Sequence, residues 1–252
     1  MTARHDPALT VVTYNIHKGF SALNRRLVVH EIRDRLHELA PDVVFLQEVQ
    51  GAHQRHSRRH VHWPQAAQHE FLAHEGGHTA YGRNAVYRDG HHGNAIVSRF
   101  PIVRSENVDV SHHVFESRGL LHCEMAVPGW REPLHCINVH LGLWARSRRF
   151  QLEWLCHRIR EAVPDGAPLV VAGDFNDWRG AASAVLAREL GLAEVFEQAL
   201  GRHARSYPAR LPLLALDRIY VRDLKVGGAQ RLAGIPWSAL SDHAALAAQL
   251  TR

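Results

Sequence analysis

The amino-acid sequence predicts an α/β (α+β) fold in which two β-sheets pack face to face and helices cover their outer faces. Strand-like apolar runs outnumber helical ones, and the helical segments are dispersed among them along the chain. Two packed sheets with helices outside would bury all of these runs. No internal repeat, low-complexity linker or sharp change in composition divides the 252 residues, so one domain is expected over residues 1–252.

The N-terminal part of the chain is predicted to form four strands and two helices. Apolar and β-branched runs predict strands at 9–14, 42–46, 85–87 and 94–98. Asp89 and Gly90 form the turn between the last two strands. Helices are predicted at 27–39 and 63–74, ended by Pro41 and Gly76 respectively. The basic, histidine-rich stretch 53–62 is interpreted as a solvated loop or as a segment that flanks the substrate path.

The rest of the chain continues this mixture of strands and helices. Strands are predicted at 108–110, 119–127, 134–140, 169–172, 216–221, 225–227 and 244–250. Pro128 and Gly129 mark a hairpin turn between the second and third of these. Helices are predicted at 148–162, where Leu152, Leu155 and Ile159 share one face, and at 181–190, which is rich in alanine.

Composition and charge are those of an ordinary soluble globular protein, with 46% hydrophobic and 22% charged residues. No apolar run reaches the roughly 20 residues that span a membrane, and Met1–Pro7 does not begin a signal peptide. Cys123, Cys136 and Cys156 lack metal-site spacing and are odd in number, which favours buried, reduced thiols in a cytoplasmic protein. The formal charge of +5 suits a phosphate-bearing substrate without indicating nucleic acid. No obligate protein partner is evident.

Short polar clusters follow the strand-like runs along the whole chain. A single cluster of this kind would most simply cap a loop or a helix start. Recurrence at independent strand ends predicts instead that the strands converge on one rim. The clusters are TYNIHKG at 13–19, LQEV at 46–49, HGNAIVSRFP at 92–101, NVHLG at 138–142, GDFND at 173–177, LDRIYV at 216–221 and SDH at 241–243.

Two of these clusters carry polar side chains two residues apart. Asp174 and Asn176 follow a buried run, and Asn138 and His140 have the same spacing. In an extended segment, residues i and i+2 point to the same side. Each pair is therefore expected to face one spot.

A divalent metal site is predicted at the first two clusters. Glu48 follows the buried run 43–46, where a carboxylate is costly unless it is paired or bound to a metal. Mg²⁺ takes oxygen ligands, often only one or two carboxylates together with water and a substrate phosphate. Glu48, with Asn15 near it, meets that demand. The alternative for Glu48 is a salt bridge to one of the many arginines.

Asp217 and His243 are the predicted acid–base pair. An imidazole titrates near neutral pH, and a buried carboxylate would fix its tautomer and stabilise its charged form. Asp242 would serve the metal or the proton. The alternative for this cluster is a loop aspartate beside a structural histidine.

Taken together and in this order, the clusters resemble those of the endonuclease/exonuclease/phosphatase (deoxyribonuclease I-like) superfamily, in particular its compact stand-alone bacterial members. The resemblance runs from Thr13 to about His243. It implies a four-layer α/β/β/α sandwich of two mainly antiparallel sheets flanked by helices. It also implies hydrolysis of a phosphoester with a divalent metal, usually Mg²⁺, for which Mn²⁺ would substitute.

The matching motifs imply roles for individual residues. Metal-site roles carry over to Asn15, Glu48 and Asp242. Catalytic roles carry over to His140, Asp174, Asn176, Asp217 and His243. Phosphate or substrate contacts carry over to Asn138 and Asn94. In this scheme Asp174 and Asn176 orient the attacking water, and either Asp174 or His243 is the general base.

Two local features bear on the substrate. Trp144, Trp178 and Trp237 each lie beside a motif, and together they would form an aromatic lip that stacks bases or contacts lipid headgroups. The alternative is that they only pack loops onto the sandwich. Arginines at a helix start, Arg146 and Arg148 among them, oppose the helix dipole, which favours binding of a second phosphate over a solvated role.

Three functions are compatible with the sequence. The first is a Mg²⁺-dependent phosphodiesterase that hydrolyses a nucleic-acid or phospholipid-headgroup diester by in-line attack of water. The second is a phosphomonoesterase on a sugar or inositol phosphate, and the third is an inactive binding module on the same fold. The complete set of acidic and histidine residues argues against the third.

Overall fold

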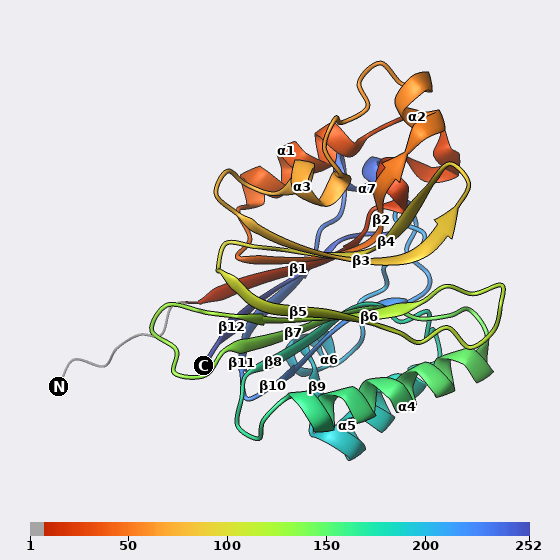
Figure 1. Ribbon diagram of the computed structural model, residues 1–252. Coiled ribbons are helices and arrows are strands. Elements are labelled where there is room, and N and C mark those ends of the chain that lie inside the picture. Colours follow the sequence, from red (N-terminus) through yellow and green to blue (C-terminus); the bar gives the residue numbers. More distant parts are fainter. Residues whose placement is uncertain (1–7) are drawn as a thin grey trace.

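The computed structural model describes residues 8–252, so the prediction made for Met1–Pro7 lies outside the described part of the chain. Two six-stranded sheets pack face to face, and helices cover the outer face of each (Figure 1). The predicted four-layer α/β/β/α sandwich is thereby confirmed. Each sheet is mainly antiparallel and has one parallel pair at its centre.

The first sheet has the strand order β11-β12-β1-β2-β4-β3. Its parallel pair is β1 (Leu9–Asn15) and β2 (Val43–His53), which α1 (Val29–Leu39) connects. The other members are β3 (His78–Tyr87), β4 (Gly90–Ser98), β11 (Lys225–Arg231) and β12 (Leu246–Thr251). The apolar face of α1 is buried in a cluster with residues of β1, β2 and β4.

The second sheet has the strand order β5-β6-β7-β8-β10-β9. Its parallel pair is β7 (Leu134–His140) and β8 (Leu169–Asp174), which α4 (Ala145–Ala162) connects. The other strands are β5 (Ile102–Asp109), β6 (Gly119–Met125), β9 (Ala193–Glu194) and β10 (Asp217–Arg222). Residues of α4 and α5 (Ala181–Leu190) are buried in one cluster against the outer face of this sheet (Figure 1).

Short helices occupy several connections. They are α2 (Gln54–Arg59), α3 (Gln68–Leu72), α6 (Val195–Leu200), α7 (Trp237–Leu240) and the 3-10 turns His17–Gly19 and Ala22–Asn24.

Two of these short helices correct the sequence predictions. The helix expected over 63–74 forms only as α3. Pro64 disfavours helical geometry at Trp63, where that helix was expected to begin. The stretch 53–62, interpreted as a loop, contains α2. His53 Nδ1 accepts a hydrogen bond from the backbone N–H of His56 over 3.1 Å and so caps α2.

Apolar side chains from both sheets fill the space between them. Phe45 and Ile96 of the first sheet belong to one buried cluster with Leu121, Cys136 and Ile219 of the second. The three cysteines are buried and free, which confirms the prediction of buried thiols. Within residues 8–252, the helices are too short or too polar to cross a bilayer.

Candidate active site

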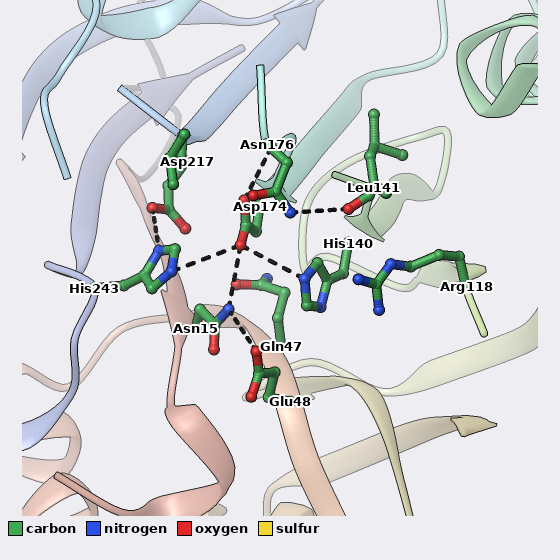
Figure 2. Close-up of polar contacts among 12 residues, drawn as sticks. Asn15, Gln47, Glu48, Arg118, His140, Leu141, Asp174, Asn176, Asp217 and His243 are labelled. Carbon is green, nitrogen blue, oxygen red and sulfur yellow. Dashed lines mark hydrogen bonds and ion pairs between the residues drawn. The ribbon is translucent and has the colours of Figure 1, made fainter. Parts of the chain in front are cut away.

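Strand ends from both sheets meet in a polar centre (Figure 2). Asn15 ends β1, and its Nδ2 donates a hydrogen bond over 3.2 Å to Oδ2 of Asp174 at the end of β8. Asp217 begins β10 and lies opposite Asp174 in the strand register, so it shares this edge. His243 precedes β12, whose residue Leu246 pairs with Thr13 of β1. The centre therefore exists only when the two sheets are docked.

Glu48 reaches this centre because β2 is bulged. The register between β2 and β4 shifts between Leu46 and Val49, so that Gln47 and Glu48 lie in the irregularity. Glu48 adopts a φ of +55°, a left-handed conformation that is uncommon outside glycine and is held here by its surroundings. Its Oε1 lies 3.4 Å from Nδ2 of Asn15. The bulge thus directs the carboxylate toward the second sheet.

Positive charge lies beside the Glu48 carboxylate. Lys18 Nζ lies 3.5 Å from Glu48 Oε2. Burial works against ionisation, but the Lys18 ammonium and the hydrogen bond from Asn15 favour the charged form, and the pKa of Glu48 is lowered to about 2. Glu48 is therefore ionised at neutral pH. An ionised carboxylate is the kind of ligand that Mg²⁺ or Mn²⁺ binds, so Glu48 fits a divalent cation. Asn15 turns its amide nitrogen toward Glu48, and its Oδ1 accepts a hydrogen bond from the backbone N–H of His17 over 3.1 Å.

Asp174 Oδ2 is the point on which the polar side chains converge. Besides Asn15, Nε2 of His140 lies 3.6 Å away and Nε2 of His243 lies 3.8 Å away (Figure 2). The second oxygen, Oδ1, accepts a hydrogen bond from the backbone N–H of Asn176 over 3.0 Å. Burial raises the pKa of Asp174 to about 6; the charge of His243 opposes this rise, and that of Asp217 adds to it.

Asp217 and His243 form the hydrogen-bonded pair that the sequence predicts. Oδ2 of Asp217 lies 2.8 Å from Nδ1 of His243, which leaves Nε2 of the imidazole facing Asp174. Burial alone would lower the pKa of His243, but the carboxylates of Asp217 and Asp174 outweigh burial and raise it to about 10. His243 is therefore protonated at neutral pH.

Asp174, Asp217 and His243 lie close enough together to be considered as a metal site. A protonated imidazole has no lone pair for a cation. The acidic groups of this trio also already neutralise the charge of His243. Glu48 is the better anchor for a metal in this centre.

His140 differs from His243 in charge. Burial, reinforced by the nearby Arg118, lowers the pKa of His140 well below its ordinary value, so its imidazole is neutral. One neutral and one protonated imidazole thus flank the Asp174 carboxylate (Figure 2).

The backbone around Asp174 is held by close approaches. Gly173 has a φ of +145°, and a Cβ at this position would lie 1.9 Å from the carbonyl oxygen of Val139. Only glycine lets β8 approach β7 this closely. Asn176 also has a positive φ, of +49°, and its Nδ2 donates to the carbonyl of Leu141 over 2.9 Å. These contacts fix the direction of the Asp174 side chain.

Asn138 lies behind the centre, between the sheets. Its Nδ2 donates to the backbone carbonyls of Leu46 and Ala95 over 2.8 and 2.7 Å. Its Oδ1 accepts a hydrogen bond from Nε2 of Gln47 over 2.8 Å. The structure therefore engages this amide in bridging the two sheets and does not bring it to the Asp174 carboxylate.

Of the other side chains predicted to contact the substrate, some are buried and hydrogen-bonded within the protein and some are exposed. Asn94 is buried and donates to a backbone carbonyl at the start of β6. Arg148 is buried, donates to the carbonyls of the loop after β7, and stacks 4.8 Å over the ring of Trp178. Trp144 and Arg146 are exposed at the start of α4.

Asp242 is held apart from Glu48 by a separate pairing. Its Oδ1 lies 3.3 Å from Nδ1 of His17, next to Lys18, which faces Glu48. His17 and Lys18 belong to the first motif, but the residue pattern alone assigns them no role. Their position directly after Asn15 was the signal that could have identified them.

Two further residues differ from what the sequence suggests. Arg118, which helps to keep His140 neutral, lies before β6 and belongs to none of the motifs, so nothing in the sequence pointed to it. Trp237 packs with its ring 5.9 Å from that of Tyr14 and belongs to the margin of a core cluster. The structure therefore does not bring Trp237 into an aromatic lip with Trp144 and Trp178.

Comparisons with known proteins agree with this arrangement. The profile of the Endonuclease/Exonuclease/phosphatase family matches residues 12–243. The chain is 47% identical over 241 residues to the uncharacterised protein YbhP of Escherichia coli (strain K12), which covers 95% of each protein.

Solved structures share the fold at low sequence identity. The mannosyl-6-phosphatase of Bacteroides thetaiotaomicron superposes with a TM-score of 0.75 at 17% identity, covering 97% of this chain and 100% of that one. TDP2 of D. rerio, complexed with a single-strand DNA product, superposes with a TM-score of 0.71 at 21% identity, covering 98% and 100%.

Proposed function

Because the chain belongs to the endonuclease/exonuclease/phosphatase family, we propose that it acts, as a single domain, as a Mg²⁺-dependent phosphodiesterase on a nucleic-acid or phospholipid-headgroup diester. One observation carries the proposal: Asp174 Oδ2 is surrounded by Asn15, His140 and His243, beside the ionised carboxylate of Glu48. A carboxylate with nitrogen donors on both sides suits in-line attack of water on a phosphate ester.

Glu48 and Asn15 would hold the metal, for which Mg²⁺ and Mn²⁺ are the candidates. When bound, such a cation neutralises the charge that develops on the phosphate oxygens. Lys18 supplies positive charge at the same carboxylate. Asp242 is paired with His17, so it would contribute to the metal site from its periphery and not beside Glu48.

Asp174 is the residue to which we assign the general base. His243 is protonated at neutral pH and so has no free lone pair at Nε2 to accept a proton. Asp174, with a pKa of about 6, is ionised at neutral pH and lies close enough to working pH to take a proton from water. The backbone N–H of Asn176 and the amide of Asn15 orient the carboxylate toward that water.

The two histidines would stabilise the phosphate as negative charge builds on it. The His243 imidazolium, fixed by Asp217, presents a charged N–H donor at Nε2. His140 presents a neutral imidazole donor from the other side of Asp174. Donors that are already in position act without reorganisation when the charge develops.

A phosphomonoesterase acting on a sugar or inositol phosphate is the second candidate. It is favoured by the fold shared with a mannosyl-6-phosphatase. The DNA product held by TDP2 on the same fold favours the diester candidate. We propose a cytoplasmic setting, which the three free thiols support.

Hydrolysis of bis-p-nitrophenyl phosphate and of p-nitrophenyl phosphate, with and without Mg²⁺, tests the proposal. Wild type is expected to cleave the diester only when metal is present. Asp174→Asn and His243→Gln are each expected to lower the rate of diester hydrolysis at least about 100-fold. Asp165→Asn and His157→Gln, at exposed positions, are the matched controls. Metal-independent cleavage, or full activity in Asp174→Asn, would refute the proposal. Cleavage of the monoester alone would select the second candidate.

A further inference from the structure

Four connections of the second sheet lie on the side of the molecule where β7 and β8 end, beside the candidate active site. They are the segments 110–118 before β6, 141–144 after β7, 175–180 after β8 and 206–216 before β10, and we call them the rim loops. Strand register places them at this edge, because β6 pairs antiparallel with β7 and β10 pairs antiparallel with β8.

Large apolar side chains are exposed on all four rim loops. Val114 and Phe115 are 90% and 94% exposed, and Trp144 is 70% exposed, so almost nothing in the molecule packs against them. A concentration of exposed apolar side chains beside a polar site marks an interaction surface. The full set is Val114, Phe115, Leu143, Trp144, Trp178, Leu211, Leu213 and Leu214.

Contacts between the rim loops make this one continuous surface. Glu116 Oε2 accepts a hydrogen bond from Nε2 of Gln151 over 3.0 Å, which holds the loop before β6 against the first turns of α4. Arg148 stacks over Trp178 and so joins α4 to the loop after β8. Trp178 and Leu213 line one cavity, which extends the surface to the loop before β10.

Unpaired arginines flank the apolar side chains. Arg146 and Arg149 in the first turns of α4 and Arg179 in the loop after β8 are exposed. Among residues 8–252, the ion pairs do not include these three, whereas Arg158 and Arg160 further along α4 each pair with a glutamate. The rim therefore offers positive charge that the protein itself does not neutralise.

We propose that the rim loops dock onto an anionic phospholipid bilayer and that the site acts on a phospholipid-headgroup diester presented there. The second half of this inference rests on the proposed phosphodiesterase function. Exposed aromatic and aliphatic side chains would enter the boundary between headgroups and acyl chains. The arginines would remain at the level of the negative headgroups, which attract basic residues near the surface.

A bilayer accommodates these exposed side chains better than a single-stranded nucleic acid does. Side chains as exposed as Val114 and Phe115 stand clear of the molecule, and a fluid bilayer accepts them without a preformed pocket. Single-stranded nucleic acid binds chiefly through base stacking on rings. Val114, Leu143 and the leucines before β10 have no ring to offer.

Co-sedimentation of the full chain with vesicles tests the docking. Wild type is expected to bind vesicles of phosphatidylcholine with phosphatidylglycerol, more weakly at high salt, and to bind phosphatidylcholine alone less well. The double variant Val114→Ser/Phe115→Ser is expected to lower the partition coefficient at least about tenfold. Val103→Ser is the matched control, because Val103 is exposed near the opposite end of β5 from the rim. Equal thermal unfolding temperatures would show that the variants are folded.

Several outcomes would overturn the inference. The first is that wild type does not bind vesicles that contain phosphatidylglycerol. The second is that the Val103→Ser control loses as much vesicle binding as the double variant. The third is that the protein binds single-stranded DNA in a way that depends on Phe115 and does not bind vesicles. Release of headgroup from the vesicles by wild type, reduced in the double variant, supports the substrate assignment. Cleavage of a soluble diester without cleavage of vesicle lipid overturns that part. Asp174→Asn is expected to bind vesicles as wild type does, because docking does not need the catalytic carboxylate. If wild type binds vesicles but hydrolyses no diester, the proposed function is contradicted and the docking proposal still holds.

Discussion

Asp174 connects residues that arrive from distant parts of the chain. Its Oδ2 meets Asn15 from the first sheet, His140 from β7 and His243 from the segment before β12. Its Oδ1 is held by the backbone of Asn176. A shift of this one carboxylate would alter every polar contact at the centre, which is why the backbone around it is so tightly held.

The charge of Asp217 can be tested separately from its hydrogen bond. Asp217→Asn keeps a partner for His243 Nδ1 but removes the charge that raises the pKa of that imidazole. Hydrolysis at neutral pH is expected to fall about 10²–10⁴-fold, and the pKa of His243 is expected to drop toward its ordinary value. Steady-state kinetics and an NMR titration of His243 measure the two effects. An unchanged titration, with Asp165→Asn as the reference, would contradict this assignment.

Glu48 is expected to bind the metal. Glu48→Gln keeps the size of the side chain and removes its charge, so Mg²⁺ or Mn²⁺ should bind at least about tenfold more weakly. A ligand that binds only the folded state raises the thermal unfolding temperature. That rise should appear in wild type and in the exposed control Glu161→Gln, and should shrink in Glu48→Gln. The same rise in all three proteins would place the metal elsewhere.

Sequence spacing predicts the face of a strand that a residue occupies but not its depth. Asn138 and His140 are two apart and share a face, as expected from an extended strand. His140 sits at the edge beside Asp174, whereas Asn138 lies one step deeper and bonds to backbone of the opposite sheet. Arg118 could not be identified at all, because its influence on His140 depends on proximity across the fold.

At the scale of elements, β2 shows why strand ends are hard to predict. The apolar run 42–46 predicts a strand that stops before Glu48, but β2 continues to His53. The later residues have no regular apolar pattern, and they are extended because β4 pairs with them after the bulge. Pairing with β4 therefore determines the length of β2. The β-propensity of the residues alone does not predict this length. The bulge that follows from this pairing is what directs Glu48 into the site.

The close approach of β8 to β7 can be tested at Gly173. Gly173→Ala would place a Cβ 1.9 Å from the carbonyl of Val139, so about 3 kcal/mol of unfolding free energy is expected to be lost. Gly166→Ala is the control, since Gly166 also has a positive φ, of +77°, but nothing lies near its Cβ position. That variant should lose about 1 kcal/mol. Urea unfolding followed by fluorescence measures both, and equal losses would argue against a steric cause.

At the scale of the whole molecule, buried histidines make stability depend on pH. His122 Nε2 lies 3.0 Å from His135 Nδ1, across β6 and β7. Burial, with His135 and Arg158 nearby, lowers the pKa of His122 to about 3, and burial lowers the pKa of His135 as well. The folded protein therefore keeps both rings neutral in mild acid.

The direction of the pH effect follows from proton uptake. The unfolded chain protonates its histidines near pH 6.5, whereas the folded chain protonates His122 and His135 at lower pH. The contribution of these two rings to stability is thus complete above about pH 6.5 and falls as pH decreases, and His122 alone should contribute a loss of about 2 kcal/mol between pH 7.5 and pH 5. His122→Gln should flatten the curve, and the exposed control His157→Gln should not. Denaturant unfolding at several pH values decides this, and parallel curves would rule out the effect.

The two-sheet architecture could be predicted from the sequence, because apolar strand-like runs and dispersed helices leave few other ways to bury them. The four layers are implied by the resemblance of the ordered motifs to those of the superfamily. The strand order could not be predicted, because β12 lies between β11 and β1 through contacts that join the two ends of the described chain. Periodicity in a sequence describes each run separately and carries no information about such partners.

The same strand order has a consequence for protein synthesis. The first sheet begins with β1 but receives β11 and β12 only after the whole second sheet has been translated. A nascent chain that has not been translated past His243 therefore lacks both β12, the antiparallel partner of β1, and the imidazole of His243. Truncated products that stop before this point cannot assemble the centre either. The order of these strands along the chain thus delays assembly of the centre until translation has passed His243.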